Sequence, residues 1–321
     1  MAKKICILAL ITILFSFGSP WVKPAIAGLP NGNRLKDPYA ILRNSLPIEQ
    51  KELRELQNKL EDTSDDLRGG RWSAISKATS RSQFLVSNRK NQILESIPET
   101  NKEKAENLLS NLKENLDELG TITNEKNKVL FLEVRSESLK KIDDLESLLI
   151  TNKYPHKIPN KYDDLPRLLG RANVEIKTSK GSMNAIIDGY NAPLTAGAFI
   201  DLSLKGFYDG LPINRAEEFF ILQTGDPKGD EIGYIDPENN KMRTIPLEIR
   251  APSLEDTIYG ETFEDIGLYT ETPILPFATL GTLGWAHSDS DLNDGSSQFF
   301  FFLYEAELNP AGRNLIDGRN A

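Results

Sequence analysis

The sequence is poor in the residues that metal sites and disulfide frameworks need. Its 321 residues include one cysteine and two histidines. One cysteine cannot form an intramolecular disulfide, and His156 has neither a cysteine nor a second histidine near it in the sequence. Basic residues are also in the minority, with 38 Lys and Arg against 47 Asp and Glu and a net charge of −9. This acidic balance argues against nucleic acid and anionic membrane surfaces as partners.

Long apolar runs are absent, and the most apolar stretch is at the N-terminus. Lys3 and Lys4 precede an apolar run over residues 5–17, and Ala25-Ile26-Ala27 follows. A membrane-spanning helix needs about 20 apolar residues, whereas this pattern is typical of a secretory signal with its cleavage site. We therefore expect residues 1–27 to be a cleaved signal peptide, with an uncleaved anchor as the alternative. The 294-residue mature chain would have a net charge of −12, no cysteine and no stable membrane insertion.

Glycine and proline are sparse between residues 40 and 152, after a polar lead-in over residues 28–39. Apolar residues recur there at helical spacing: Leu53, Leu56, Leu60 and Leu67; Leu108, Leu109, Leu112, Leu116 and Leu119; and Leu139, Ile142, Leu145, Leu148 and Leu149. A weaker helical pattern covers residues 72–97, and breaks are expected at Gly69-Gly70, Pro98 and Gly120. The segment is therefore predicted to be a bundle of four or five helices. The stripes are interpreted as its core; a face that binds a partner is the alternative.

A proline-rich linker over residues 153–170 leads to a part of the chain with strand patterns. Val174 and Ile176 alternate with polar residues, as in a half-buried strand. A helix is expected from Pro193, with Phe199 and Leu202 facing inward. The more polar stretch between residues 227 and 257 is expected to be a loop that contains a short hairpin.

Two aromatic strands in this part have a distinctive sequence. Arg215 precedes the stretch Phe220-Ile221-Leu222-Gln223-Thr224-Gly225-Asp226, and Ser297-Gln298-Phe299-Phe300 follows later. Together these stretches resemble the cyclophilins, the barrel-forming peptidyl-prolyl isomerases. The helical segment in front and the signal peptide make the whole chain similar to the large cyclophilins of the thylakoid lumen.

The resemblance implies an α+β multidomain protein: an N-terminal all-α helical bundle, then a cyclophilin-like antiparallel β-barrel over residues 171–321. The family pattern continues with further strands after the equivalent of Asn320, so the barrel is expected to be incomplete at its C-terminus as given. The family's histidine before the catalytic arginine is Asn214 here. This change at the rim of the peptide-binding pocket is expected to affect turnover more than peptide binding.

The resemblance also assigns the site. Arg215 is the expected catalytic donor, and Gln223 the residue that orients the peptide backbone. The expected substrate-binding residues are Phe220, Ile221, Ala286, His287, Gln298, Phe300 and Ile316. For Phe220 and Phe300, plain barrel core is an equally weighted alternative. No metal or other cofactor is implied.

The expected activity is peptidyl-prolyl cis–trans isomerisation of exported proteins in the thylakoid lumen or periplasm of a cyanobacterium-like cell. Its partners would be proline-containing segments of protein clients, photosystem II subunits being one candidate. The alternative is a catalytically weak peptide-binding chaperone or scaffold that assists photosystem II assembly.

Overall fold

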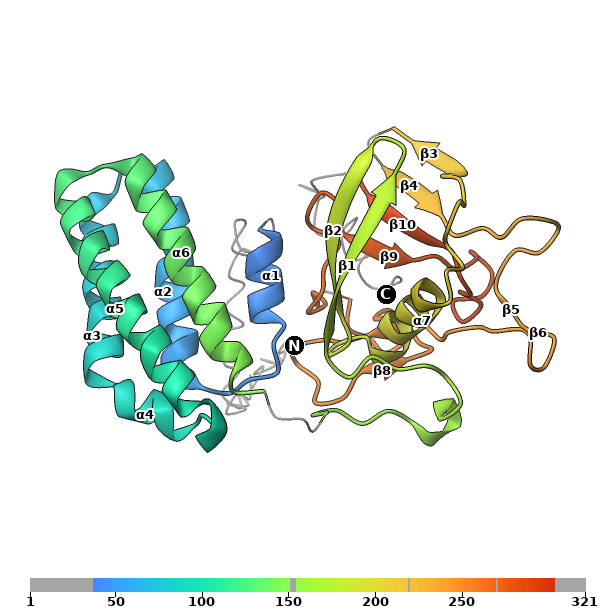
Figure 1. Ribbon diagram of the computed structural model, residues 1–321, viewed down its shortest axis with the longest axis horizontal. Helices are drawn as coiled ribbons and strands as arrows, with labels where there is room; N and C mark the ends of the chain where they lie inside the picture. The colour runs from blue at the N-terminus through green and yellow to red at the C-terminus, as the bar shows by residue number, and fades with distance from the viewer. Residues whose placement is uncertain (1–36, 151–153, 219, 270, 304–321) are drawn as a thin grey trace, which may run out of the picture. The chain divides into compact units, whose positions relative to one another are not determined.

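The computed structural model describes residues 37–150, 154–218, 220–269 and 271–303, and the first of these ranges is helical. It contains α1 Pro38–Asn44, α2 Lys51–Arg68, α3 Trp72–Asn88, α4 Lys90–Glu95, the 3-10 turn η1 Glu99–Asn101, α5 Lys102–Glu125 and α6 Lys128–Ser147. The four long helices, α2, α3, α5 and α6, lie side by side (Figure 1). None of the helices that the structure describes is long and apolar enough to cross a membrane.

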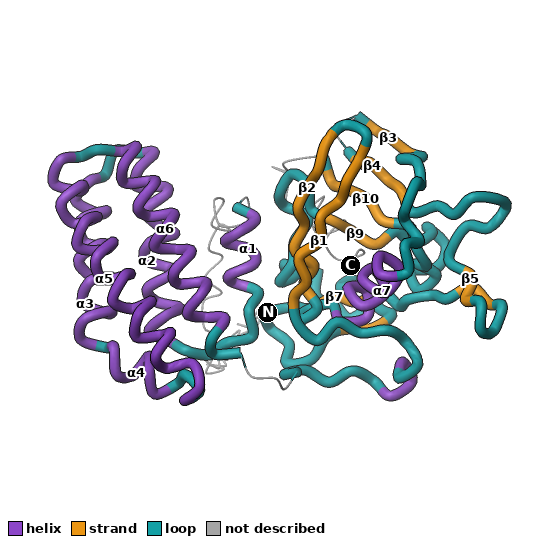
Figure 2. Tube along the Cα trace, in the orientation of Figure 1, coloured by secondary structure: helices purple, strands orange, loops and turns teal. Residues whose placement is uncertain are grey.

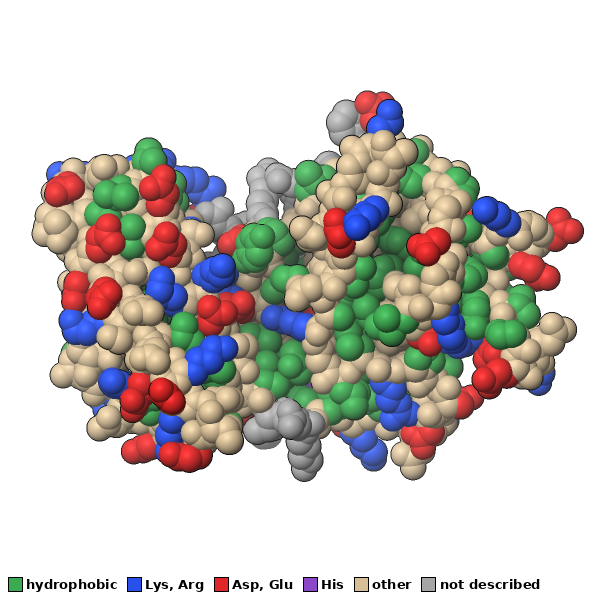
Figure 3. Space-filling model, viewed as in Figure 1, with side chains coloured by type: hydrophobic (Ala, Val, Ile, Leu, Met, Phe, Trp, Pro, Cys, Tyr) green, Lys and Arg blue, Asp and Glu red, His purple; other side chains and the backbone are tan. Residues whose placement is uncertain are grey.

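The leucine stripes form the core of these helices, which confirms their interpretation. The most buried members are at most 1% exposed: Leu53, Leu56, Leu60, Leu109, Leu112, Leu116, Leu119, Ile142 and Leu145. Burying a leucine side chain contributes about 2 kcal/mol. On the face seen in Figure 3, acidic and basic side chains are interspersed over the helices, as expected for a solvated surface.

Side-chain caps explain where two of the long helices begin. The side-chain oxygen of Gln50 accepts from the backbone N–H of Leu53 at 2.6 Å, and Asn127 accepts from Leu130 at 3.2 Å. Each cap gives a partner to an N–H that the helix itself leaves without one. The residue after α5, Lys126, has a left-handed backbone (φ 56°) and ends that helix.

The helix breaks differ from the sequence prediction at two places. Gly120 does not end a helix but lies within α5, where a Cβ atom would be 3.0 Å from Nε2 of Gln83. That nitrogen donates to the carbonyl of Leu116 at 3.1 Å, so the glycine makes room for a contact between α3 and α5. The single helix expected over residues 72–97 is divided at Arg89 into α3 and α4.

The later part of the chain contains short strands and one long helix. After the 3-10 turn η2 Asn160–Tyr162 come β1 Arg171–Thr178, β2 Gly181–Asp188, α7 Pro193–Leu204, β3 Arg215–Glu217, β4 Ile221–Thr224, β5 Ile235–Asp236, β6 Lys241–Met242, β7 Glu248–Ile249, β8 Ile258–Tyr259, β9 Leu283–Trp285 and β10 Phe299–Phe302. The described strands pair in antiparallel sheets of order β1-β2, β3-β4-β10-β9, β5-β6 and β7-β8. Much of the chain between β4 and β9 is loop (Figure 2), and β5-β6 is the hairpin expected there.

Helix α7 packs against the strand β10 and forms a second core. The ring of Phe199 meets the ring of Phe299 edge to face at 5.0 Å, and Leu202 is fully buried. These inward positions confirm the prediction for the helix that begins at Pro193. The described strands with α7, preceded by the helices, confirm the α+β fold class, and their sheets do not close into a barrel within the described residues.

A buried polar cluster connects the end of α1 to the base of the β1-β2 hairpin. Arg171 donates to a carboxylate oxygen of Asp188 at 2.8 Å, to the hydroxyl of Ser45 at 2.8 Å and to the carbonyl of Leu42. Asn191 donates from its amide to the carbonyl of Ser45 at 2.9 Å and to Asp188 at 3.0 Å. The buried carboxylate of Asp188 therefore has the charged and polar partners that burial requires.

Candidate active site

The four-stranded sheet aligns the predicted catalytic residues in one row. Arg215 on β3 is paired with Gln223 on β4, Gln223 with Phe300 on β10, and Phe300 with Gly284 on β9. Residues directly opposite in antiparallel strands have side chains on the same face. The strand register therefore places a guanidinium, an amide and a phenyl ring side by side, although they are up to 85 positions apart in the sequence.

An apolar cluster adjoins this row on the same face of the sheet. Ile221, Phe300 and Phe302 are buried together with Phe277, whose ring stacks on Phe300 at 5.7 Å with an interplanar angle of 21°. Gly284 allows this arrangement, because a Cβ there would lie 2.4 Å from the ring of Phe300. The ring of Phe300 can thus lie over β9 only because this strand has no side chain at that point.

Hydrogen bonds orient the two glutamines of the site. The amide nitrogen of Gln298 donates to a carboxylate oxygen of Asp226 at 2.9 Å and to the carbonyl of Ile232 at 3.0 Å. Its oxygen is then left to accept from the amide nitrogen of Gln223 at 2.8 Å. The oxygen of Gln223 in turn accepts from Nη1 of Arg215 at 3.3 Å. The chain of amides fixes which end of Gln223 faces the guanidinium.

Arg215 also has a carboxylate partner on its own strand. The Oε1 atom of Glu217 is 2.7 Å from Nε of Arg215 and 2.5 Å from Nη2. The two residues are two positions apart in β3, so their side chains project from the same face. Both are about half exposed, with 51% of the Arg215 side chain and 46% of the Glu217 side chain accessible.

The structure brings most of the predicted site residues together. Arg215, Gln223 and Gln298 form the hydrogen-bonded chain, and Ile221 and Phe300 belong to the apolar cluster, with Ala286 packed against it. Phe220 is 41% exposed, and the centre of its ring is 6.3 Å from that of Phe302. His287 follows Ala286, and its ring nitrogen Nδ1 is hydrogen-bonded to the carbonyl of Ser288. Ile316 lies outside the described residues.

Several residues of the site were not among the sequence candidates, among them Phe277, Phe302 and Glu217. Phe277 is far from both motifs in the sequence and had no signal of its own. Phe302 could have been found from the period-2 alternation of β10, which puts it on the same face as Phe300. Glu217 could have been found in the same way from its position two residues after Arg215.

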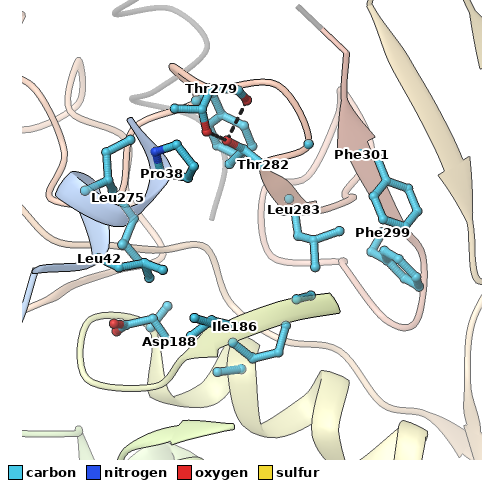
Figure 4. A pocket seen from close by; sticks show the side chains of 18 of the residues that line it. Pro38, Leu42, Ile186, Asp188, Leu275, Thr279, Thr282, Leu283, Phe299 and Phe301 are labelled. Carbon is cyan, nitrogen blue, oxygen red and sulfur yellow. Dashed lines mark hydrogen bonds between the residues drawn. The ribbon is translucent and has the colours of Figure 1, made fainter. Parts of the chain in front are cut away.

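A cavity of about 470 Å³ lies on the other face of β10. Figure 4 shows its lining by Phe299 and Phe301, which alternate with Phe300 along the strand, and by Leu42, Ile186 and Leu283. Thr279 and Thr282, whose hydroxyls are 3.0 Å apart, add polar groups. Its lining includes Gly284 at the β9 end of the row, and also Phe277, but it does not include Arg215, Gln223 or Phe300. In the part of the chain that the structure describes, no three His, Cys, Asp or Glu side chains are grouped so as to hold a metal ion.

Two family models match the chain, and their ranges correspond to its two parts. Residues 37–150 match the PsbQ-like domain of CYP38-like peptidyl-prolyl cis-trans isomerases, and residues 173–319 match the cyclophilin-type peptidyl-prolyl cis-trans isomerases. A solved cyclophilin-type isomerase of Cryptosporidium parvum is 21% identical with a TM-score of 0.33, over 47% of this chain and 75% of that one.

Named relatives match nearly the whole length of this chain. A protein of Synechocystis sp. named as a thylakoid lumen peptidyl-prolyl cis-trans isomerase is 44% identical over 94% of this chain and 79% of its own. The chloroplastic isomerase CYP38 of Arabidopsis thaliana is 35% identical over 94% of this chain and 71% of its own. These matches confirm the resemblance seen in the sequence. The chain belongs to the cyclophilin-type peptidyl-prolyl cis-trans isomerases that join a PsbQ-like helical domain to a cyclophilin domain.

Proposed function

We propose that this chain isomerises X–Pro bonds in lumenal proteins, with Arg215 as the catalytic donor. The observation that supports this most is the row of Arg215, Gln223 and Phe300 across the sheet, with an apolar cluster beside it. The cis and trans forms of an X–Pro bond differ little in free energy, but rotation takes tens to hundreds of seconds because amide resonance must be broken. A catalyst therefore has to stabilise only the twisted state.

The side chains of the row match that task. In the twisted amide the prolyl nitrogen becomes pyramidal and can accept a hydrogen bond, which the guanidinium of Arg215 donates. This bond forms only in the twisted state, so it lowers the barrier rather than tightening ground-state binding. Gln223, held by Gln298, orients the peptide backbone. No nucleophile or proton transfer is needed.

The apolar cluster is the proposed seat of the proline ring. Ile221 and Phe300 line it, Ala286 borders it, and the exposed ring of Phe220 lies at its edge. His287, the next residue after Ala286, would contact the neighbouring part of the peptide. Burying a proline ring there leaves the preceding carbonyl free to rotate.

The lumenal location is proposed from the names of the relatives and from the N-terminal pattern. Protein isolated from its native cell is expected to begin at Gly28, because signal peptidases recognise small residues such as Ala25 and Ala27. N-terminal sequencing measures this directly. An intact Met1 on the protein from cells would exclude the cleaved signal, and Ala27→Arg should block cleavage as a control.

The alternative function is a catalytically weak chaperone or scaffold for photosystem II subunits. Two observations favour keeping it: residues 37–150 match a domain described as PsbQ-like, and the donors of Arg215 are partly occupied by Glu217. The two functions are separated by measuring both binding and turnover of an Ala-Pro peptide with the full chain. Acceleration of cis–trans exchange supports the isomerase. Saturable binding to the Arg215 face without acceleration supports the scaffold.

The hydrogen bonds between the glutamines give a more specific prediction. Gln298→Ala should lower kcat/KM by about five- to tenfold, because Gln223 loses the acceptor that fixes its amide and one net hydrogen bond is worth about 1 kcal/mol. Asn239→Ala, in the β5-β6 hairpin turn, is the control and should leave kcat/KM unchanged. Equal activity of Gln298→Ala and the unmutated chain would contradict a positioning role.

A further inference from the structure

We propose that Glu217 is an internal competitor for the catalytic guanidinium and lowers the activity of the site. This inference rests on the proposed isomerase function, which it deepens by naming a residue that tunes the reaction. The Oε1 atom of Glu217 accepts a hydrogen bond from Nε of Arg215 at 2.7 Å and lies 2.5 Å from Nη2, so the carboxylate forms an ion pair along that edge of the guanidinium.

The donor groups of Arg215 show why this contact matters. A guanidinium has five N–H groups and no acceptor. Glu217 accepts from the Nε–H group and its carboxylate lies against Nη2, and Gln223 accepts from one N–H of Nη1. A twisted prolyl amide must therefore use a remaining N–H group or displace the carboxylate. The carboxylate also offsets the positive charge that would stabilise electron density on the prolyl nitrogen.

The position of Glu217 in the strand makes the competition intrinsic to the site. Residues 215 and 217 project from the same face of β3, and the backbone of β3 is held in register by its pairing with β4. Glu217 is itself paired with Ile221, a residue of the apolar cluster. The strand register thus places Glu217 opposite a residue of the proposed proline seat, while its carboxylate contacts the guanidinium.

The expected effect is moderate because the pair is half exposed. Measured contributions of exposed ion pairs reach about 1 kcal/mol, which corresponds to a factor of about five. Such pairs are also screened by salt. Releasing Arg215 from Glu217 should therefore raise activity by about two- to fivefold at low ionic strength, and added salt should have part of the same effect.

The test compares two isosteric variants of the full chain. Glu217→Gln removes the competing charge, and Glu218→Gln removes a charge from the adjacent residue, which forms none of the ion pairs found among the described residues. Both variants change the net charge equally. The rate of cis–trans exchange of an Ala-Pro peptide is measured by NMR at about 20 mM and at about 300 mM NaCl. Between these concentrations the Debye length falls from about 20 Å to about 6 Å.

The inference is supported if Glu217→Gln raises kcat/KM two- to fivefold at low salt while Glu218→Gln matches the unmutated chain. Salt should then raise the activity of the unmutated chain and of Glu218→Gln, and leave Glu217→Gln unchanged. An active chain whose Glu217→Gln variant is no faster would overturn the competitor role and leave the isomerase proposal standing. Complete inactivity of the folded chain and of both variants would overturn both proposals.

Discussion

Arg215→Ala is expected to lower kcat/KM for a proline peptide by about 100-fold or more. Removing one preorganised donor to a transition state typically has an effect of this size. The reason lies in the register of the sheet, which places Arg215 in one row with Gln223 and Phe300. The peptide affinity should change by less than about threefold, because the arginine acts on the twisted state.

The experiment measures the turnover, the peptide dissociation constant and the folding of each variant. Exchange rates from NMR give the turnover, and chemical-shift titration of the same peptide gives the dissociation constant. Arg215→Lys retains the charge but not the planar fork of donors, so it should recover only part of the loss. Half of the Arg215 side chain is exposed, and the thermal midpoint of both variants should remain unchanged. Unaltered turnover in Arg215→Ala would exclude Arg215 as the catalytic donor.

The sequence was sufficient for the elements whose pattern is local. The leucine spacing of α2, α5 and α6 reports a single buried face, so it predicts each helix and its core together. The end of a helix is less predictable, because it depends on tertiary contacts. Gly120 continues α5 because Gln83 of α3 occupies the space beside it, a relation that no local pattern reveals.

The same division applies to the candidate site. The two aromatic motifs identify Arg215, Gln223 and Phe300, but only the strand register shows that they form one row. Phe277 joins the cluster from a loop with no recognisable pattern. The polar cluster of Ser45, Arg171 and Asp188 is a similar case, because its members come from segments more than a hundred residues apart. The sequence therefore indicates the individual residues, whereas their assembly depends on long-range packing.

A buried carboxylate, Glu248, connects the short strand β7 to the start of α7. It is 2% exposed and accepts from the backbone N–H groups of Leu194 at 3.1 Å and Thr195 at 2.9 Å. The N-cap residue Ala192 has no side-chain acceptor, so Glu248 serves the helix N-terminus from a distant strand. Burial raises the pKa of Glu248 to about 7, although the two N–H groups favour its charged form.

Two other groups, one buried and one partly buried, also couple folding to pH, with opposite signs. Burial raises the pKa of Glu146 to about 8 despite the nearby guanidinium of Arg54, 3.5 Å away. Burial, with the charge of Arg250, lowers the pKa of His156 to about 4. A raised carboxylate pKa stabilises the fold at low pH, whereas a lowered histidine pKa destabilises it as the pH falls below about 6.5. The pH profile of the whole chain sums these terms, so a single-residue difference is needed to isolate one of them.

The contribution of Glu248 to the free energy of unfolding is expected to fall by about 2–3 kcal/mol between pH 5 and pH 8. Its folded pKa of about 7 is above the unfolded value of about 4.5. The stabilisation is therefore complete below the unfolded pKa and is lost as the pH rises through the folded one. Urea unfolding of the unmutated chain and of Glu248→Gln at both pH values gives the difference directly, since glutamine can still accept from α7 but does not ionise. Glu255→Gln, which changes an exposed carboxylate, is the control: its free energy of unfolding should depend on pH in the same way as that of the unmutated chain. A pH-independent difference between the unmutated chain and Glu248→Gln would show that Glu248 titrates alike in the folded and unfolded states.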